Sequence, residues 1–226
     1  MKRLTVILLG LAVAVCAGCK PGYSAAPPEV LRPQKVLNFE TLYQQNCAGC
    51  HGAQGKNGAA VALASDVYLA IADDATIRRI TAEGVPGTAM PAFAQSHGGM
   101  LTDEQIDALV KGLRARVVQY KDLAPPSYVA LSPGDAKRGS EVYNAYCLSC
   151  HGAAGRGGSR SGSIVDGSYL ALVSDRYLRT IVIVGRPELG APDWRENVPG
   201  QPMSEQDVSD VVAWLSAQRT GIGGTQ

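Results

Sequence analysis

The sequence is poor in aromatic residues and histidine, and neither sign of charge is in excess. Its 226 residues include 2 phenylalanines, 2 tryptophans and 3 histidines, and Lys and Arg stand against Asp and Glu at 21 to 20. A charge this close to neutral offers no basic surface, so no nucleic-acid partner is expected. No convincing alternation of apolar and polar residues indicates a half-buried strand, which favours an all-α fold.

The apolar run at the N-terminus, residues 4–15, is shorter than the roughly 20 residues of a membrane-spanning helix. It follows Lys2 and Arg3 and is followed by small residues, which is the order of a signal peptide. We therefore predict a signal peptide over residues 1–18 that is removed on export, in preference to a permanent transmembrane anchor. Removal takes away two cations and no acid, so the net charge changes from +1 to −1.

Ala17-Gly18-Cys19 resembles the cleavage box of bacterial lipoproteins, in which the cysteine becomes the lipidated first residue. The usual aliphatic residue three positions before that cysteine is replaced here by Cys16. The resemblance implies a lipid on Cys19 and a location on the periplasmic side of a bacterial membrane. The alternative is an ordinary secreted protein that is cut after Ala17.

Two proline-containing stretches divide the rest of the chain. Residues 19–35 hold four prolines and little apolar periodicity, which is typical of an extended tether. Residues 123–133 are predicted to be a linker. These breaks leave a first repeat (residues 36–122), a second repeat (residues 134–219) and a C-terminal tail (residues 220–226), and each repeat has the size of a small domain.

One five-residue motif occurs in each repeat. Cys47-Ala48-Gly49-Cys50-His51 returns as Cys147-Leu148-Ser149-Cys150-His151. C-x-x-C-H is a haem-attachment signature, because two thiols one helical turn apart can each form a thioether with a haem vinyl group while the adjacent histidine reaches the iron. A zinc half-site and a redox dithiol are the alternatives for C-x-x-C alone. The histidine that follows both times favours two covalent haem c groups.

The surroundings of the two motifs also repeat, and their periodicity is helical. A short helix is predicted to lead into each motif, and a middle helix is predicted over residues 75–82 and again over residues 175–184, each ended by a glycine. Thr102, which stands in a capping box, and Ser204 are predicted to begin the last helix of each repeat.

This order of helix, motif, glycine-rich loop, middle helix and capped last helix resembles a class I cytochrome c in both repeats. The resemblance implies two tandem all-α domains, each wrapped around one covalently attached haem c. It also implies that His51 and His151 are the proximal iron ligands, with the second ring nitrogen of each held by a backbone carbonyl. In the first repeat Met90-Pro91, on the loop after the middle helix, matches the family's distal segment, so Met90 is the predicted sixth ligand.

Two other residues of the first repeat could in principle bind iron, but each is expected to have a different role. Met100 lies just before the last helix, where an apolar residue usually packs onto the core. His97 is flanked by Ser96 and Gly98 and is expected on a solvent-facing loop.

The second repeat departs from the pattern on its distal side. Alignment of the two loops places Ala191 where Met90 stands. After His151 the sequence contains no histidine, no lysine and a single methionine, Met203, which aligns with Leu101. Three hypotheses stay open: Met203 is a displaced sixth ligand, the distal side is open or filled by water, or the donor is one of Tyr169, Tyr177 and Asn197.

Iron with His and Met ligands, and with no cluster of acid, base or nucleophile beside it, predicts an electron carrier and not an enzyme. We expect a membrane-tethered dihaem protein that passes single electrons in a respiratory or photosynthetic chain, with a dehydrogenase, a quinol-oxidising complex or a terminal oxidase as partner. One alternative is a haem enzyme or sensor whose second haem is five-coordinate and binds peroxide or a small gas. Another is a cytochrome subunit of a larger oxidoreductase complex.

Overall fold

The computed structural model of the chain describes residues 31–116 and 123–219. The predicted signal peptide, Cys19 and the C-terminal tail lie outside these residues. The chain divides into two units, residues 1–33 and residues 34–226, and both repeats belong to the second unit.

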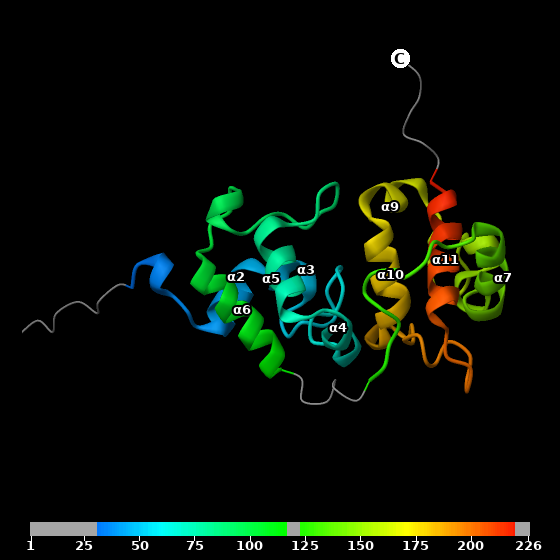
Figure 1. Ribbon diagram of the computed structural model, residues 1–226, viewed down its shortest axis with the longest axis horizontal. Coiled ribbons are helices and arrows are strands. Elements are labelled where there is room, and N and C mark those ends of the chain that lie inside the picture. Colours follow the sequence, from blue (N-terminus) through cyan, green and yellow to red (C-terminus); the bar gives the residue numbers. More distant parts are fainter. Residues whose placement is uncertain (1–30, 117–122, 220–226) are drawn as a thin grey trace, which may run out of the picture. The chain divides into compact units, whose positions relative to one another are not determined.

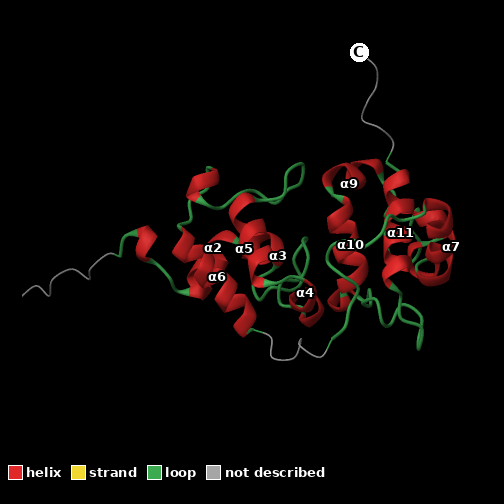
Figure 2. Ribbon diagram, viewed as in Figure 1, coloured by secondary structure: helices red, strands yellow, loops and turns green. Residues whose placement is uncertain are grey.

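The described residues form helices joined by loops (Figure 2). Within this part of the chain there is no strand, and β-type pairing is confined to the isolated bridges Ala94–Leu101 and Arg186–Ala191. The predicted all-α fold is confirmed. None of the helices in residues 31–116 and 123–219 is long and apolar enough to cross a lipid bilayer.

The two repeats have the same order of helices (Figure 1). The first contains α2 (Phe39–Asn46), α3 (Ala48–His51), α4 (Asp66–Ile71), α5 (Asp74–Glu83) and α6 (Asp103–Ala115). The second contains α7 (Ala136–Tyr146), α8 (Leu148–His151), α9 (Gly167–Leu172), α10 (Asp175–Val184) and α11 (Glu205–Ala217). Short 3-10 turns lie at Pro33–Lys35, Gln95–His97, Ala153–Gly155 and Pro187–Leu189. Periodicity predicts the first, middle and last helices of each repeat, but it does not predict α4 and α9, which are shorter than two turns.

The predicted starts and stops of the helices are confirmed. The Thr102 hydroxyl accepts the Gln105 N–H and the Gln105 side chain accepts the Thr102 N–H, so α6 begins with a complete capping box. Ser204 begins α11 in the same way. Gly84 and Gly185 end α5 and α10 with φ of 70° and 64°, a left-handed backbone that a β-carbon would strain.

The first and last helices of each repeat pack closely through one large residue and one glycine. The glycine lies on the last helix in the first repeat and on the first helix in the second repeat. In the first repeat Phe39 of α2 packs on Gly112 of α6, where an added β-carbon would lie 2.0 Å from the Phe39 ring. In the second repeat the small residue is Gly139 of α7, and the large one is Trp214 of α11. A β-carbon on Gly139 would lie 2.0 Å from the backbone carbonyl oxygen of Asp210 and 2.8 Å from Trp214. The large and small partners have therefore changed places between the repeats.

An arginine at the end of the last helix fastens the middle of each repeat. Arg114, in the last turn of α6, donates to two carbonyls at the end of α4 and to Asp74 at the start of α5. Arg219, just beyond α11, donates to two carbonyls at the end of α9 and to Asp175 at the start of α10. The carbonyls are those of Leu69 and Ala72 in the first repeat and of Leu170 and Val173 in the second.

The predicted linker is bound to the second repeat at Ser127. The Ser127 N–H donates to Glu205 over 2.7 Å, and the Ser127 carbonyl accepts from the buried Arg179 guanidinium over 2.7 Å. Arg179 and Glu205 also form an ion pair. The start of the linker is therefore part of the packed structure, which its proline content alone does not predict.

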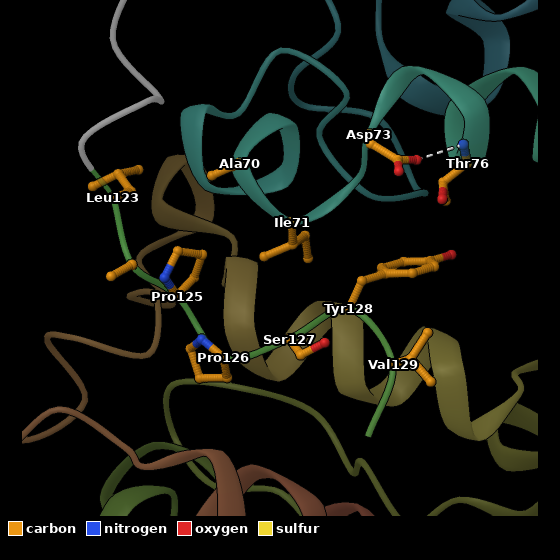
Figure 3. A pocket seen from close by; sticks show the side chains of 11 residues that line it. Ala70, Ile71, Asp73, Thr76, Leu123, Pro125, Pro126, Ser127, Tyr128 and Val129 are labelled. Atoms are coloured by element: carbon orange, nitrogen blue, oxygen red, sulfur yellow. Dashed lines mark hydrogen bonds between the residues drawn. The ribbon is translucent and has the colours of Figure 1, made fainter. Parts of the chain in front are cut away.

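A cavity runs along the same stretch of chain (Figure 3). Tyr128, the two prolines before Ser127, and Ile71 line it, together with the Asp73 side chain that caps α5 by accepting the Thr76 N–H over 2.7 Å. The lining residues include none from either C-x-x-C-H motif.

Candidate functional site

The first motif lies at the junction of two helices. Cys47 ends α2, and α3 carries Cys50 and His51. His51 is 7% exposed, and its Nδ1 lies 2.8 Å from the carbonyl oxygen of Val61. Because a carbonyl can only accept, Nδ1 carries the hydrogen and Nε2 keeps its lone pair. Burial lowers the pKa of His51, against the opposing effect of the Val61 hydrogen bond, so the imidazole is neutral as an iron ligand must be.

In the second motif, at the end of α7 and in α8, the expected backbone carbonyl is wrong, because a side-chain hydroxyl holds Nδ1 of the histidine. His151 is partly buried, and its Nδ1 lies 2.9 Å from the hydroxyl oxygen of Ser161. That hydroxyl donates its single hydrogen to the Cys150 carbonyl over 2.9 Å. It can therefore only accept from His151, which again leaves Nε2 free. In the first motif the backbone makes both bonds. The Val61 carbonyl accepts from His51, and the Ala60 N–H donates to the Cys50 carbonyl.

The four thiols of the motifs are unpaired. Cys47, Cys50, Cys147 and Cys150 form no disulfide. Burial raises the pKa of Cys47 to about 11 and that of Cys147 to about 12. A redox dithiol needs a thiol whose pKa is lowered, so these values disfavour that alternative. In residues 31–116 and 123–219, no three His, Cys, Asp or Glu side chains are placed to hold a bare metal ion.

A tyrosine ties each motif to the helix before it. The Tyr43 hydroxyl donates to the Gly52 carbonyl over 2.9 Å, and the Tyr143 hydroxyl donates to the Gly152 carbonyl over 2.5 Å. Both glycines have positive φ, and a β-carbon on Gly52 would lie 1.7 Å from the Lys56 carbonyl oxygen. The chain therefore turns tightly after each histidine, and the tyrosine fixes this turn.

The distal loop of the first repeat packs on the end of α5. Gly84 lies so close to the Met90–Ala92 segment that an added β-carbon would be 2.6 Å from the Ala92 nitrogen. The Val85 N–H donates to the Met90 carbonyl over 3.0 Å, and Met90 itself is partly buried. Met90 is thus fixed on the loop after α5, as the sequence predicts, and its ligation of iron stays a prediction.

The other donors of the first repeat lie at the surface. His97 is exposed beside Ser96, as predicted. The expectation for Met100 is wrong, because its side chain is 78% exposed. The neighbouring Leu101, 5% exposed, packs onto the core instead, since its N–H bonds the Phe93 carbonyl and directs the side chain inward.

These features fit covalently attached haem. Each motif offers two unpaired thiols one turn apart and an imidazole whose Nε2 is free, and this arrangement occurs twice. A family model described as cytochrome c oxidase, cbb3-type, subunit III matches residues 34–111 and, a second time, residues 134–215. The chain belongs to this family. As a tandem cytochrome of the cbb3-type subunit III family, it has two haem c groups as its cofactors, one for each match.

Individual relatives agree with the family match. The cytochrome is 30% identical over 155 residues to the cbb3-type cytochrome c oxidase subunit CcoP of Azospirillum sp. strain B510, a match that covers 62% of this chain and 48% of that protein. The chain thus spans about half the length of that relative. It is 22% identical over 220 residues to the cytochrome c subunit of the cytochrome bc1 complex of Mycobacterium tuberculosis, covering 94% of this chain and 74% of that protein.

One solved structure, a chain of the reducing HAO-like protein complex of Kuenenia stuttgartiensis, matches 86% of this cytochrome and covers 99% of its own length. The identity is 18% and the TM-score is 0.47, so the similarity carries no argument about function.

Sequence reasoning finds the cysteines and histidines of this cytochrome but misses the groups that orient them. Ser161, Tyr43 and Tyr143 all contact a motif. The two tyrosines carry a signal, because each stands four positions before the first cysteine of its motif. No such sequence signal points to Ser161. At the corresponding position of the first repeat, Val61 bonds the histidine through its backbone carbonyl, so the residue type there predicts nothing about the contact.

Proposed function

We propose that this chain is a dihaem c-type cytochrome that passes single electrons as part of a membrane-associated respiratory assembly. The observation that carries the proposal is the repeated motif with its free thiols and its histidine held through Nδ1. Each domain, residues 36–122 and residues 134–219, would hold one haem through two thioethers and the Nε2 of His51 or His151. The haem supplies a one-electron iron couple.

The surrounding residues support electron transfer without catalysis. The motif histidines are held through Nδ1, so the proximal ligand needs little rearrangement when the iron changes oxidation state. Met90 would close the distal side of the first haem. The partner surface would be largely apolar, because the chain is near neutral and Leu148, inside the second motif, is 39% exposed.

The partners would be other subunits or proteins of a respiratory chain. The relatives are described as parts of a terminal oxidase and of a bc1 complex, which supports a subunit of a larger redox complex over a freely diffusing carrier. A quinol-oxidising complex, a terminal oxidase or a dehydrogenase on the periplasmic side of a bacterial membrane fits this role.

Haem content and redox behaviour test the proposed function. The purified full chain should contain two covalent haems per polypeptide by the pyridine haemochrome method, and both should titrate reversibly as one-electron centres. The Cys147→Ser/Cys150→Ser double variant should keep one haem, since the thioethers of the second motif cannot form. A full chain with fewer than two covalent haems, or with haems that do not cycle reversibly, would contradict the proposal.

We propose further that a lipid on Cys19 anchors the protein. The Cys19→Ser variant should move from the membrane fraction to the soluble periplasmic fraction while keeping both haems. The matched control is Cys16→Leu, which removes the other nearby cysteine, gives the cleavage box its usual aliphatic residue and should stay with the membrane. Retention of Cys19→Ser in the membrane fraction would show that something other than this lipid holds the chain there.

A further inference from the structure

The two distal loops share the backbone bond that closes them at the predicted ligand position. The Val85 N–H donates to the Met90 carbonyl over 3.0 Å, and the Arg186 N–H donates to the Ala191 carbonyl over 2.8 Å. Gly185 approaches the Pro192 carbonyl as Gly84 approaches the segment after Met90. The alignment is therefore structural, and a methyl group with no lone pair occupies the place of the methionine sulfur.

Met203 is built into the core and occupies the place of Leu101. Its N–H donates to the Trp194 carbonyl over 2.9 Å, as the Leu101 N–H does to Phe93 over 2.8 Å. The side chain is 4% exposed, against the partial exposure of Met90. Its sulfur lies 3.9 Å from the Asn197 amide nitrogen.

A cavity beside Met203 also supports its assignment as a core residue and not an iron ligand. Residues 124–127 of the linker, Leu131 and Trp194 line it together with Met203, and the lining includes no residue of the second motif. On this side Met203 therefore faces the linker and the start of α11, and no residue of the second motif.

The other candidate iron ligands of the second repeat, Asn197, Tyr169 and Tyr177, are either hydrogen-bonded elsewhere or protonated. The Asn197 amide donates to the Asp193 carbonyl over 3.1 Å. Burial raises the pKa of Tyr169 to about 12 and also raises the pKa of Tyr177, so both phenols keep their hydrogen at neutral pH and are weak iron ligands. The sequence after His151 contains no histidine or lysine that could replace them.

The charges of the distal loop are paired with one another. Arg186 bonds Glu188 over 2.7 Å, and Arg195 bonds Asp193 over 2.5 Å. Arg186 also donates to the Gly58 carbonyl over 2.5 Å. The rest of the loop is apolar around Ala191, with Pro187, Leu189 and Pro192. Such a surface suits a neutral molecule better than an anion or a peroxide that needs an acid and a base.

We propose that the chain supplies a sixth iron ligand to the first haem only, through Met90, and that the distal side of the second haem, beside Ala191, takes a small neutral diatomic molecule such as carbon monoxide or nitric oxide. The inference rests on the proposed two-haem function. It adds a ligand-binding site to the proposed electron carrier.

Carbon monoxide titration of the reduced full-length protein tests this inference. We expect one carbon monoxide per two haems, together with resonance Raman markers of one high-spin and one low-spin iron before addition. Met90→Ala should raise the stoichiometry to two. Ala191→Met should abolish binding and turn the second iron low-spin, because it restores the donor of the first repeat.

Met203→Leu is the matched control, since leucine is the residue at the corresponding position 101. It should leave both the stoichiometry and the spin states unchanged. The inference is overturned if the wild type binds no carbon monoxide, or if Met203→Leu creates a new high-spin iron. Either result with two reversible haems still present would leave the electron-transfer function intact, whereas a haem count below two would count against that function itself.

Discussion

Replacing Gly139 with alanine should destabilise the second repeat by about 3 kcal/mol. The new β-carbon would lie 2.0 Å from the Asp210 carbonyl oxygen, which is backbone and cannot rotate away. Helices α7 and α11 would have to separate, and the stacked rings of Tyr143 and Trp214, whose centroids are 4.4 Å apart, would separate with them. The helix preference of alanine over glycine, about 1 kcal/mol, offsets only part of this cost.

The measurement is urea unfolding of the holoprotein followed by tryptophan fluorescence. Both tryptophans of the chain, Trp194 and Trp214, lie in the second repeat, so the signal reports that repeat alone. Gly162→Ala is the control, because an added β-carbon there has nothing within 4 Å. An unfolding midpoint for Gly139→Ala equal to that of the control would show that the two helices tolerate separation.

A double variant tests the exchange of large and small residues directly. Gly139→Phe combined with Trp214→Gly copies the arrangement of Phe39 and Gly112 into the second repeat. We expect it to lose less stability than the sum of its two single variants, because the phenylalanine ring can enter the space that the Trp214 ring leaves, while the contact with the Asp210 carbonyl remains in both Gly139→Phe variants.

Replacing Asp210 with alanine should cost about 1 to 3 kcal/mol of unfolding free energy. Asp210 is fully buried on α11, where its carboxylate accepts the Asp135 N–H over 2.7 Å, the Gln206 amide over 2.7 Å and the Arg138 guanidinium. Removing the carboxylate takes this acceptor from the Asp135 N–H, whereas Arg138 still bonds Asp207 and Gln206 still bonds the Pro133 carbonyl. The first repeat has Ala108 at the corresponding position of α6, so alanine itself is compatible with the fold, and the cost belongs to the donors.

The control is Asp107→Ala, which removes an exposed carboxylate that pairs with Arg78 over 2.8 Å. An ion pair this exposed contributes little to stability, because water and salt screen it. Equal losses from Asp107→Ala and Asp210→Ala would contradict the role assigned to Asp210.

The Asp210 contribution should also depend on pH. Burial alone would raise the pKa of Asp210, but the hydrogen bonds from Asp135, Gln206 and Arg138 outweigh it and hold the pKa below its ordinary value. A lowered pKa means that the stabilisation is present above the unfolded-state pKa, about 3.9, and is lost as the pH falls through the folded value. The difference between wild type and Asp210→Ala should therefore be constant near neutrality and shrink in acid.

Local patterns in the sequence predict much of this molecule. The motifs, the capping box at Thr102 and the glycines that end α5 and α10 are each written in fewer than six consecutive residues, so their structure follows from their own chemistry. The assignment of Leu101 instead of Met100 to the core shows the limit of such patterns. Both residues are apolar and adjacent, and the backbone bonds of Leu101 with Phe93 and Gln95, which lie earlier in the chain, decide which one turns inward.

Contacts between distant segments were beyond reach of the sequence. The exchange of Phe39 and Gly112 for Gly139 and Trp214 pairs residues more than seventy positions apart, and a pairwise substitution leaves no periodic signal. The bond from Arg179 to the Ser127 carbonyl likewise turns a proline-containing segment into part of the packed second repeat.

The two haem sites differ in how a single substitution can affect them, because His151 is oriented by the Ser161 side chain and His51 by a backbone carbonyl. A backbone carbonyl exists whatever residue occupies position 61, so no exchange of side chain there can remove the acceptor that orients His51. At position 161 a single codon change removes both the acceptor for His151 and the donor to Cys150. One substitution at position 161 can therefore change how the proximal histidine of the second haem is oriented. No substitution at position 61 removes the acceptor that orients the proximal histidine of the first haem.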